Sequence, residues 1–232
     1  MKPRLKRGSS KKCKELNMQH DIQRMWEIFS IHAHSVLELR AISPIGQPTI
    51  CLMFRGRDYV SVEALKSALE QKTLKLNVQG RNTYIVMNPI KEDLTSKSTK
   101  DSDIACRRLL LVDIDRAQKA NAPATDDEVE AARLAAMQIK NFTNSLGLSE
   151  PMLVMSGNGY HLYYRLDDLP NTEESKNLIA RTLGNLATRF NNDLVHVDTS
   201  VSNAGRITKI PGTMAFKGTE TQDRPYRKAQ IK

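Results

Sequence analysis

The chain has 232 residues, of which 40% are hydrophobic, and it carries a formal net charge of +9 at pH 7. This length suits one large domain or two small ones with a real core. No apolar run reaches the length of a membrane-spanning helix, and the basic N-terminus is not followed by the apolar segment of a signal peptide. We therefore expect a soluble, intracellular protein of the cytoplasm with no membrane partner.

Basic residues gather at the two ends of the chain. Residues 1–14 contain seven Lys and Arg residues and no acid, whereas residues 217–232 contain five basic residues and two acids. Because cations in tails or along a rim attract polyanions, this distribution favours a nucleic-acid partner. The sequence predicts a basic disordered tail over residues 1–16.

The next part of the chain predicts an N-terminal α/β unit over residues 17–90. Its expected elements are a helix over 17–30, strands over 35–42 and 50–54, a helix over 61–72 and a strand over 83–87. A polar stretch rich in Ser and Thr follows, and we expect it to form a mobile linker over residues 91–104.

Residues 105–232 alternate strands and helices in a different order. The expected elements are a strand over 107–115, a helix over 126–146, a hairpin of strands 152–155 and 160–166, a helix over 173–190, a strand over 195–197, and short strands over 206–210 and 214–217. This order fits an RRM-like split βαβ sheet with helices on one face. The predicted fold class is therefore α/β of the α+β type. The N-terminal unit packs against the RRM-like unit as one composite domain.

Three acids stand at the ends of apolar runs. Asp113 and Asp115 close a buried strand, and alternation along the strand places both carboxylates on one face. Two such carboxylates repel each other unless a cation lies between them, and Mg²⁺ or Mn²⁺ prefers carboxylate oxygen. Asp198 follows another apolar residue and offers a third carboxylate. The three cysteines are far apart in sequence, so we expect no zinc.

A second set of residues suits the binding of phosphate. Ser156 to His161, with the sequence SGNGYH, joins two strands through glycines whose amides can cradle an anion. Arg206 gives bidentate phosphate contacts, and Lys209, three residues later, gives a point charge. A nucleoside triphosphate with a metal would satisfy these cations and the acids together. Each motif alone is also compatible with a glycine hairpin or with surface ion pairs.

Together these segments resemble a known family. LVDID (111–115), SGNGYH (156–161) and VDTS…RITKIPGT (197–213) are similar, in order and spacing, to the three motifs of the archaeo-eukaryotic primase superfamily. ELR (38–40), VMNPI (86–90) and KGTETQDRPYRKA (217–229) resemble the primase-polymerases of phages, plasmids and CRISPR-linked elements. The resemblance runs from about Ser35 to the end of the chain.

The resemblance implies a DNA primase-polymerase core. Its expected reaction is template-directed nucleotidyl transfer from a dNTP or NTP to a 3′-OH by a two-metal mechanism, together with primer synthesis. The expected partners are a single-stranded DNA template with its primer and a helicase or C-terminal primase region outside this chain. The implied site residues are the metal-binding acids Asp113, Asp115 and Asp198, the nucleotide-binding residues Ser156, Gly157, Asn158, Gly159, His161, Arg206 and Lys209, and the nucleic-acid-binding residues Lys217, Arg224, Arg227 and Arg40.

Three alternatives stay open. LLLVDID followed by LVMSG also resembles haloacid-dehalogenase-type phosphatases, although Ala117 stands where those enzymes usually have Thr or Val. A second alternative is an RRM-like nucleic-acid-binding module without catalysis, although its aromatic content of 5% is low for stacking on bases. His32-Ala-His34 resembles the metal-binding histidine pair of rolling-circle nicking enzymes, but it ends a predicted helix instead of lying on a strand.

Overall fold

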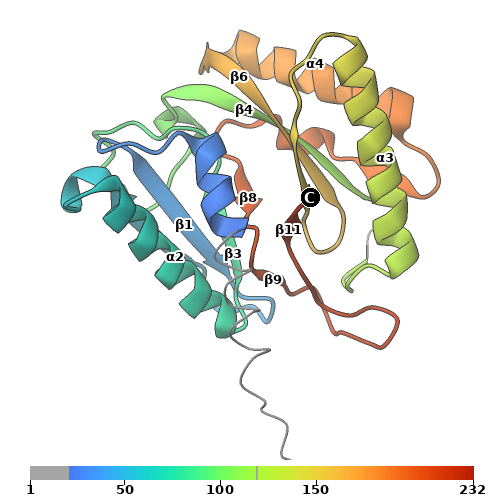
Figure 1. The fold of residues 1–232 in the computed structure, drawn as a ribbon, viewed down its shortest axis with the longest axis horizontal. Coiled ribbons are helices and arrows are strands. Elements are labelled where there is room, and N and C mark those ends of the chain that lie inside the picture. The colour runs from blue at the N-terminus through green and yellow to red at the C-terminus, as the bar shows by residue number, and fades with distance from the viewer. Residues whose placement is uncertain (1–20, 119) are drawn as a thin grey trace, which may run out of the picture.

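The computed structural model describes residues 21–118 and 120–232 and is shown in Figure 1. The tail predicted over residues 1–16 lies outside the described residues. Residues 21–29 are helical, and the side chains of Ile22, Met25 and Trp26 are buried, as their spacing predicts. Among the described residues, none of the helices combines the length and the apolar character needed to span a membrane.

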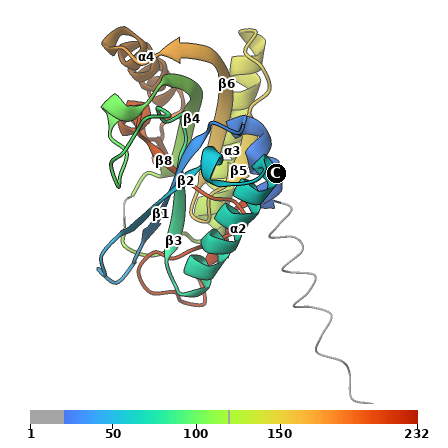
Figure 2. The same ribbon diagram turned by 90° about the vertical axis from the view of Figure 1, so that its left-hand side faces the viewer.

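Four antiparallel strands form the sheet that we call the N-terminal sheet. Its order is β2-β1-β3-β8, with β1 (Val36–Ile42), β2 (Ile50–Arg55), β3 (Asn82–Val86) and β8 (Ile207–Lys209). Helix α2 (Val62–Val78) lies along β1, β2 and β3 (Figure 2). The Ser61 hydroxyl caps α2 by accepting a hydrogen bond from the Ala64 amide. The helix extends six residues past the predicted end, because Leu76 and Asn77 continue its buried face.

The second sheet, which we call the C-terminal sheet, has the order β11-β5-β6-β4-β7. Its strands are β4 (Cys106–Arg116), β5 (Met152–Met155), β6 (Tyr160–Pro170), β7 (Val195–Val197) and β11 (Gln230–Ile231), all paired antiparallel. Helices α3 (Asp126–Ser145) and α4 (Glu173–Phe190) cover the side of this sheet away from the N-terminal sheet (Figure 1). Strands β4 to β7 with these helices have the split βαβ order. The predicted fold class is confirmed.

One strand of the N-terminal sheet comes from the second half of the chain. Strand β8 pairs with β3, placing Lys209 opposite Tyr84 and Ile207 opposite Val86. The open edge of β3 presents backbone N–H and C=O groups that need partners, and β8 supplies them. The chain therefore passes from one sheet to the other more than once, and the two sheets belong to one fold.

A second crossing is made by residues 213–232, which we call the C-terminal strap. Asn82 donates to the carbonyl of Phe216 at 2.6 Å and accepts from its amide at 2.8 Å, and Asn77 holds Met214 in the same two-sided manner. The strap then pairs β9 (Met214–Ala215) with β10 (Arg227–Lys228) and ends in β11 beside β5. It therefore ties the N-terminal sheet to the C-terminal sheet.

Glu128, in the first turn of α3, fastens the middle of the strap. Arg116 donates to its carboxylate at 2.8 Å and Arg224 donates twice, at 2.8 and 3.0 Å, while the Thr125 amide adds a fourth hydrogen bond at 2.8 Å. Partial burial opposes ionisation, but these hydrogen bonds outweigh it and hold the pKa of Glu128 at about 2. The ionised form of Glu128 is therefore part of what keeps the strap in place.

This cluster predicts a pH dependence of stability. Because the folded-state pKa of Glu128 lies below its ordinary value of 4.5, its contribution is complete above about pH 4.5 and is lost as the pH falls toward about 2. Glu128→Gln should lower the free energy of unfolding at neutral pH and flatten its fall in acid. Urea denaturation at several pH values measures both effects.

Glu130→Gln is the matched control. Glu130 lies on the same helix and forms an exposed ion pair with Arg133, which should contribute little to the free energy of unfolding. If Glu128→Gln left both the neutral-pH stability and the acid slope at the wild-type values, the assigned role of Glu128 would be wrong.

Candidate active site between the two sheets

Strand β4 carries Asp113 and Asp115 on the face that looks toward the N-terminal sheet. Across the C-terminal sheet, Asp113 pairs with His161 on β6, and Asp115 pairs with His196 on β7. Ile114 is fully buried on the other face, as strand alternation predicts. The two acids and two histidines therefore form one polar row across the sheet.

This row borders a cleft of about 460 Å³ to which both sheets contribute. Most of the residues that we predicted from the acid, glycine and cation motifs meet there, but Gly157, Gly159 and Asp198 are not in its lining. The N-terminal sheet contributes Ile42, Asn82, Tyr84, Ile207, Thr208 and Lys209 to its lining. The C-terminal sheet and its hairpin contribute Leu111, Asp113, Asp115, Ser156, Asn158 and His161. The remaining lining residues are Arg206, Ala215, Phe216 and Lys217. A smaller hollow on the far side of Asp115 is lined by His196, Asp198 and Lys217.

The environments of Asp113 and Asp115 push their pKa values apart. Burial alone raises the pKa of Asp113, but the nearby charges of His161, Arg206 and Lys217 outweigh it and lower the value. The pKa of Asp115 is raised by burial and by the negative charge of Asp113. The pKa of His161 is lowered by burial but raised more strongly by Asp113. Nε2 of His161 lies 3.3 Å from Oδ1 of Asp113.

Asp198 stands directly beside this pair. Its amide donates to the carbonyl of Asp113 at 2.8 Å, which fixes the end of β7 against β4. Its carboxylate accepts from the Ser200 amide at 2.8 Å and lies 3.5 Å from the Arg206 guanidinium. The third acid is thus next to the first two, but its side chain faces Arg206.

The donor chemistry of these acids suits Mg²⁺ or Mn²⁺. Oδ1 of Asp113 is buried, and within the described residues its polar contact is the 3.3 Å approach of the His161 ring, so a hard cation would complete its surroundings. The described part of the chain contains no preformed group of three or more His, Cys, Asp or Glu side chains around a metal position. The carboxylate of Asp198 is engaged by Arg206 and the Ser200 amide instead.

Lys209 is a buried cation on the N-terminal side of the cleft. Only 4% of the residue is exposed, and its ammonium donates to the Met214 carbonyl at 2.7 Å and lies 5.5 Å from the centre of the Tyr84 ring. Burial lowers its pKa to about 7. Because no acid pairs with it in the described structure, an anion in the cleft would favour its charged form.

The SGNGYH hairpin brings its glycines close to other parts of the protein. A Cβ at Gly159 would clash with the Ile114 carbonyl and lie 2.6 Å from Oδ1 of Asp115. Gly157 has a φ of +108° and packs against Ala215 of the strap. Asn158 accepts a hydrogen bond from the Ala124 amide at 2.9 Å. The hairpin thus shapes the wall of the cleft, and direct contact of its residues with a nucleotide stays a prediction.

The four residues predicted to contact nucleic acid differ in their surroundings. Lys217 lines both the cleft and the smaller hollow. Arg224 is bound to Glu128, and Arg227 donates to Asp126 at 2.6 Å. Arg40 donates to the fully buried Glu38 at 2.7 Å. Lys217 is therefore the one of these four that lines the cleft and forms no ion pair among the described residues.

Sequence reasoning missed several residues that line these two hollows. Four of them belong to no motif that we recognised: Asn82, Tyr84, Phe216 and His196. Thr208 lies within the third motif, but no role was assigned to it. Alternation along β3 could have placed Asn82 and Tyr84 on one face, but it could not show that this face borders the acids.

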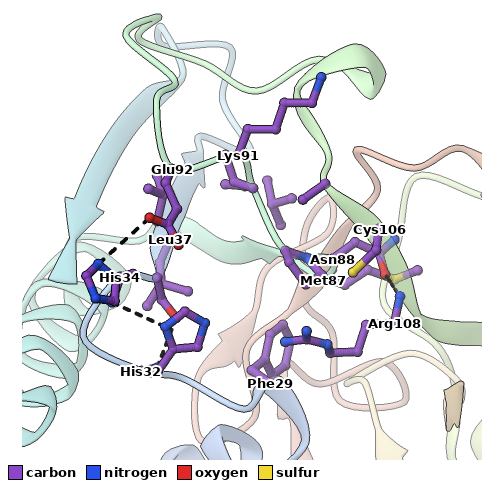
Figure 3. Close-up of a pocket in the computed structure, with 16 residues that line it drawn as sticks. Phe29, His32, His34, Leu37, Met87, Asn88, Lys91, Glu92, Cys106 and Arg108 are labelled. Atoms are coloured by element: carbon purple, nitrogen blue, oxygen red, sulfur yellow. Dashed lines mark hydrogen bonds and ion pairs between the residues drawn. The ribbon is translucent and has the colours of Figure 1, made fainter. Parts of the chain in front are cut away.

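A separate pocket of about 200 Å³ lies near the start of β1 and β4 (Figure 3). His32 and His34 lie in the loop that precedes β1, with Nδ1 of His34 at 3.8 Å from Glu92 and Nδ1 of His32 accepting from the His34 amide. Neither histidine is on a strand, so the strand-borne pair of a nicking enzyme is not formed.

No protein-family model and no curated protein matches this chain. Solved structures of similar fold do match. The AEP domain of the cyanophage S-2L primase-polymerase has a TM-score of 0.52 and 16% identity, with 92% of this chain and 88% of that chain covered. The polymerase domain of Mycobacterium tuberculosis Ligase D, solved in complex with DNA, has a TM-score of 0.52 and 15% identity, with 92% and 80% covered. Primase RepB′ has a TM-score of 0.50 and 12% identity, with 93% and 56% covered. The similarity confirms that this chain has the fold of archaeo-eukaryotic primase domains.

The glycine packing beneath Asp115 generates a prediction. Gly159→Ala should destabilise the protein by about 1–3 kcal/mol, because the new methyl group meets a backbone carbonyl that cannot move freely. Gly184→Ala in α4 is the control. Its Cβ would meet nothing within 4 Å, so it should stabilise by about 0.5–1 kcal/mol. Thermal and urea unfolding of both variants measure the difference, and equal effects of one sign would contradict the assigned packing.

Proposed function

We propose that this chain, which has the fold of archaeo-eukaryotic primase domains, is a nucleotidyltransferase that extends a nucleic-acid strand on a single-stranded DNA template. The proposed donor is a dNTP or an NTP, and the acceptor is a 3′-OH. The observation that carries the proposal is the cleft itself, in which Asp113 and Asp115 share the lining with Arg206 and the buried Lys209, while Asp198 lies just outside it in an ion pair with Arg206. A metal-bound triphosphate would neutralise both groups.

In this proposal the acids and the cations have separate tasks. Asp113, Asp115 and Asp198 would hold Mg²⁺ or Mn²⁺, which when bound supplies positive charge close to the phosphate oxygens. Arg206 would leave its ion pair with Asp198 and bind phosphate instead. The Asp198 carboxylate would then be free to bind the metal. Lys209 and His161 would orient the phosphates from opposite walls of the cleft. Fixed positions and fixed charges would provide most of the rate enhancement.

Lys217 is the residue that we assign to the nucleic acid beside the cleft. It lines both the cleft and the smaller hollow, so it lies where a strand terminus would approach Asp115. The DNA bound to the Ligase D polymerase domain supports DNA as the partner of this fold. We also include a helicase or further primase region as a partner and a mobile genetic element as the source, because the sequence motifs resemble those of such replication proteins.

A non-catalytic RRM-like module is the second candidate, and the structure gives it little support. Such modules stack bases on aromatic side chains exposed on the sheet. Here Tyr163, on the cleft face of β6, is only 2% exposed and is hydrogen-bonded on its hydroxyl. The acids on the same face would also repel phosphate unless a cation compensates them.

The central test is extension of a labelled primer on a single-stranded template with Mg²⁺ or Mn²⁺ and each set of nucleotides. Wild-type protein should extend the primer, and a chelator should abolish extension until metal is added back. Asp113→Ala should lower the rate at least about 100-fold while the circular dichroism spectrum is kept, because it removes a ligand and a fixed charge. Asp167→Ala, at an exposed acid on β6, should keep wild-type activity.

The other outcomes separate the alternatives. Full activity of Asp113→Ala would contradict the proposal. Absence of extension together with hydrolysis of an aryl phosphate would favour the phosphatase. Absence of both, together with salt-sensitive binding of single-stranded DNA, would favour the binding module. A repeat without primer tests primer synthesis.

A further inference from the structure

A buried row of three polar side chains crosses from one sheet to the other. Nδ1 of His161 lies 2.9 Å from the hydroxyl of Tyr163, which forms a short hydrogen bond with the hydroxyl of Thr208. The exposed fractions of these residues are 7%, 2% and 1%. His161 and Tyr163 belong to β6, whereas Thr208 belongs to β8. The row is therefore a direct side-chain link between the C-terminal sheet and the N-terminal sheet.

The two ends of this His161–Tyr163–Thr208 row lie beside different charged residues of the cleft. The other ring nitrogen of His161 faces Asp113 at 3.3 Å, so one end touches the acids. Thr208 directly precedes Lys209 and follows Arg206 by two residues, so the other end carries the cations. Tyr163 therefore lies between the residue that contacts Asp113 and the strand that carries Lys209.

We propose that Tyr163 and Thr208 are positioning residues, which hold the His161 ring toward Asp113 and fix β8 against β6 so that both halves of the site meet one nucleotide. This inference rests on the proposed function, because the ligand that both halves meet is the nucleotide of that reaction. Neither hydroxyl needs to touch the substrate. Hydrogen-bonded on one nitrogen and held close to Asp113 on the other, the ring loses a contact if it turns.

A neighbouring pair shows what a purely structural tyrosine looks like in this protein. Tyr164, the next residue of β6, points to the opposite face, and its hydroxyl lies 2.8 Å from that of Thr143 on α3. Both residues are as buried as Tyr163, with 2% and 4% exposed. The two tyrosine–threonine pairs therefore match in chemistry and burial, and they differ in whether they reach the cleft.

The experiment compares Tyr163→Phe and Thr208→Val with Tyr164→Phe and Thr143→Val. Each variant removes one buried hydroxyl, so all four should lower the melting temperature by similar amounts. Only Tyr163→Phe and Thr208→Val should lower kcat/KM for nucleotide, by about 10-fold or more, because small displacements of reacting groups are costly. The KM for primer-template should stay within about two-fold. Thr208→Ser keeps the hydroxyl and should restore activity.

The ring signals of His161 in nitrogen-15 NMR give a second readout that needs no turnover. They should change in Tyr163→Phe and stay at wild-type values in Tyr164→Phe. If Tyr163→Phe matches Tyr164→Phe in both kinetics and NMR, the positioning role is overturned. If wild-type protein does not extend primers, the proposed function fails, and the NMR comparison alone decides whether Tyr163 orients His161.

Discussion

The placing of two half-buried carboxylates, Asp113 and Asp115, on one face of β4 is the constraint on which the rest of this structure depends. Two carboxylates on adjacent same-face positions of a strand repel each other, and partial burial removes some of the water that would screen them. The protein answers with cations that come from elsewhere in the chain: His161 across the sheet, and Arg206 and Lys217 from beyond it. These residues reach the acids because of the way in which the two sheets are joined.

Two crossings of the chain make that joining. Strand β8 leaves the C-terminal half to complete the edge of β3, and it brings Arg206 and Lys209 with it. The C-terminal strap then returns to β5 and sets Phe216 and Lys217 at the mouth of the cleft. The side chains of Asn77 and Asn82 hold the start of the strap, because each bonds both the N–H and the C=O of one strap residue. The cleft is therefore a product of the tie between the sheets and belongs to neither sheet alone.

Much of the positive charge near the cleft is used by the protein itself. Arg116 and Arg224 share Glu128, Arg227 binds Asp126, and Arg40 binds the buried Glu38. A guanidinium that is fixed in this way organises the backbone around the site and is less available to phosphate. Lys209 and Lys217 form no ion pair with an acid among the described residues, and both line the cleft. The number of basic residues in the sequence therefore overstates the positively charged surface that is available to DNA.

The sequence by itself determined most of the helices and strands, the RRM-like order of strands β4 to β7 and the three acids at the ends of apolar runs, because apolar periodicity and strand alternation act over neighbouring residues. It also determined the one-face pairing of Asp113 and Asp115. It did not predict β10, β11 or the last six residues of α2. Only the tertiary structure decided that β8 belongs to the N-terminal sheet, that Arg224 binds Glu128 and Arg227 binds Asp126, and that Thr208 meets Tyr163. These contacts join residues 45 to 125 positions apart, and no local pattern encodes which edge or which carboxylate such a distant residue will reach.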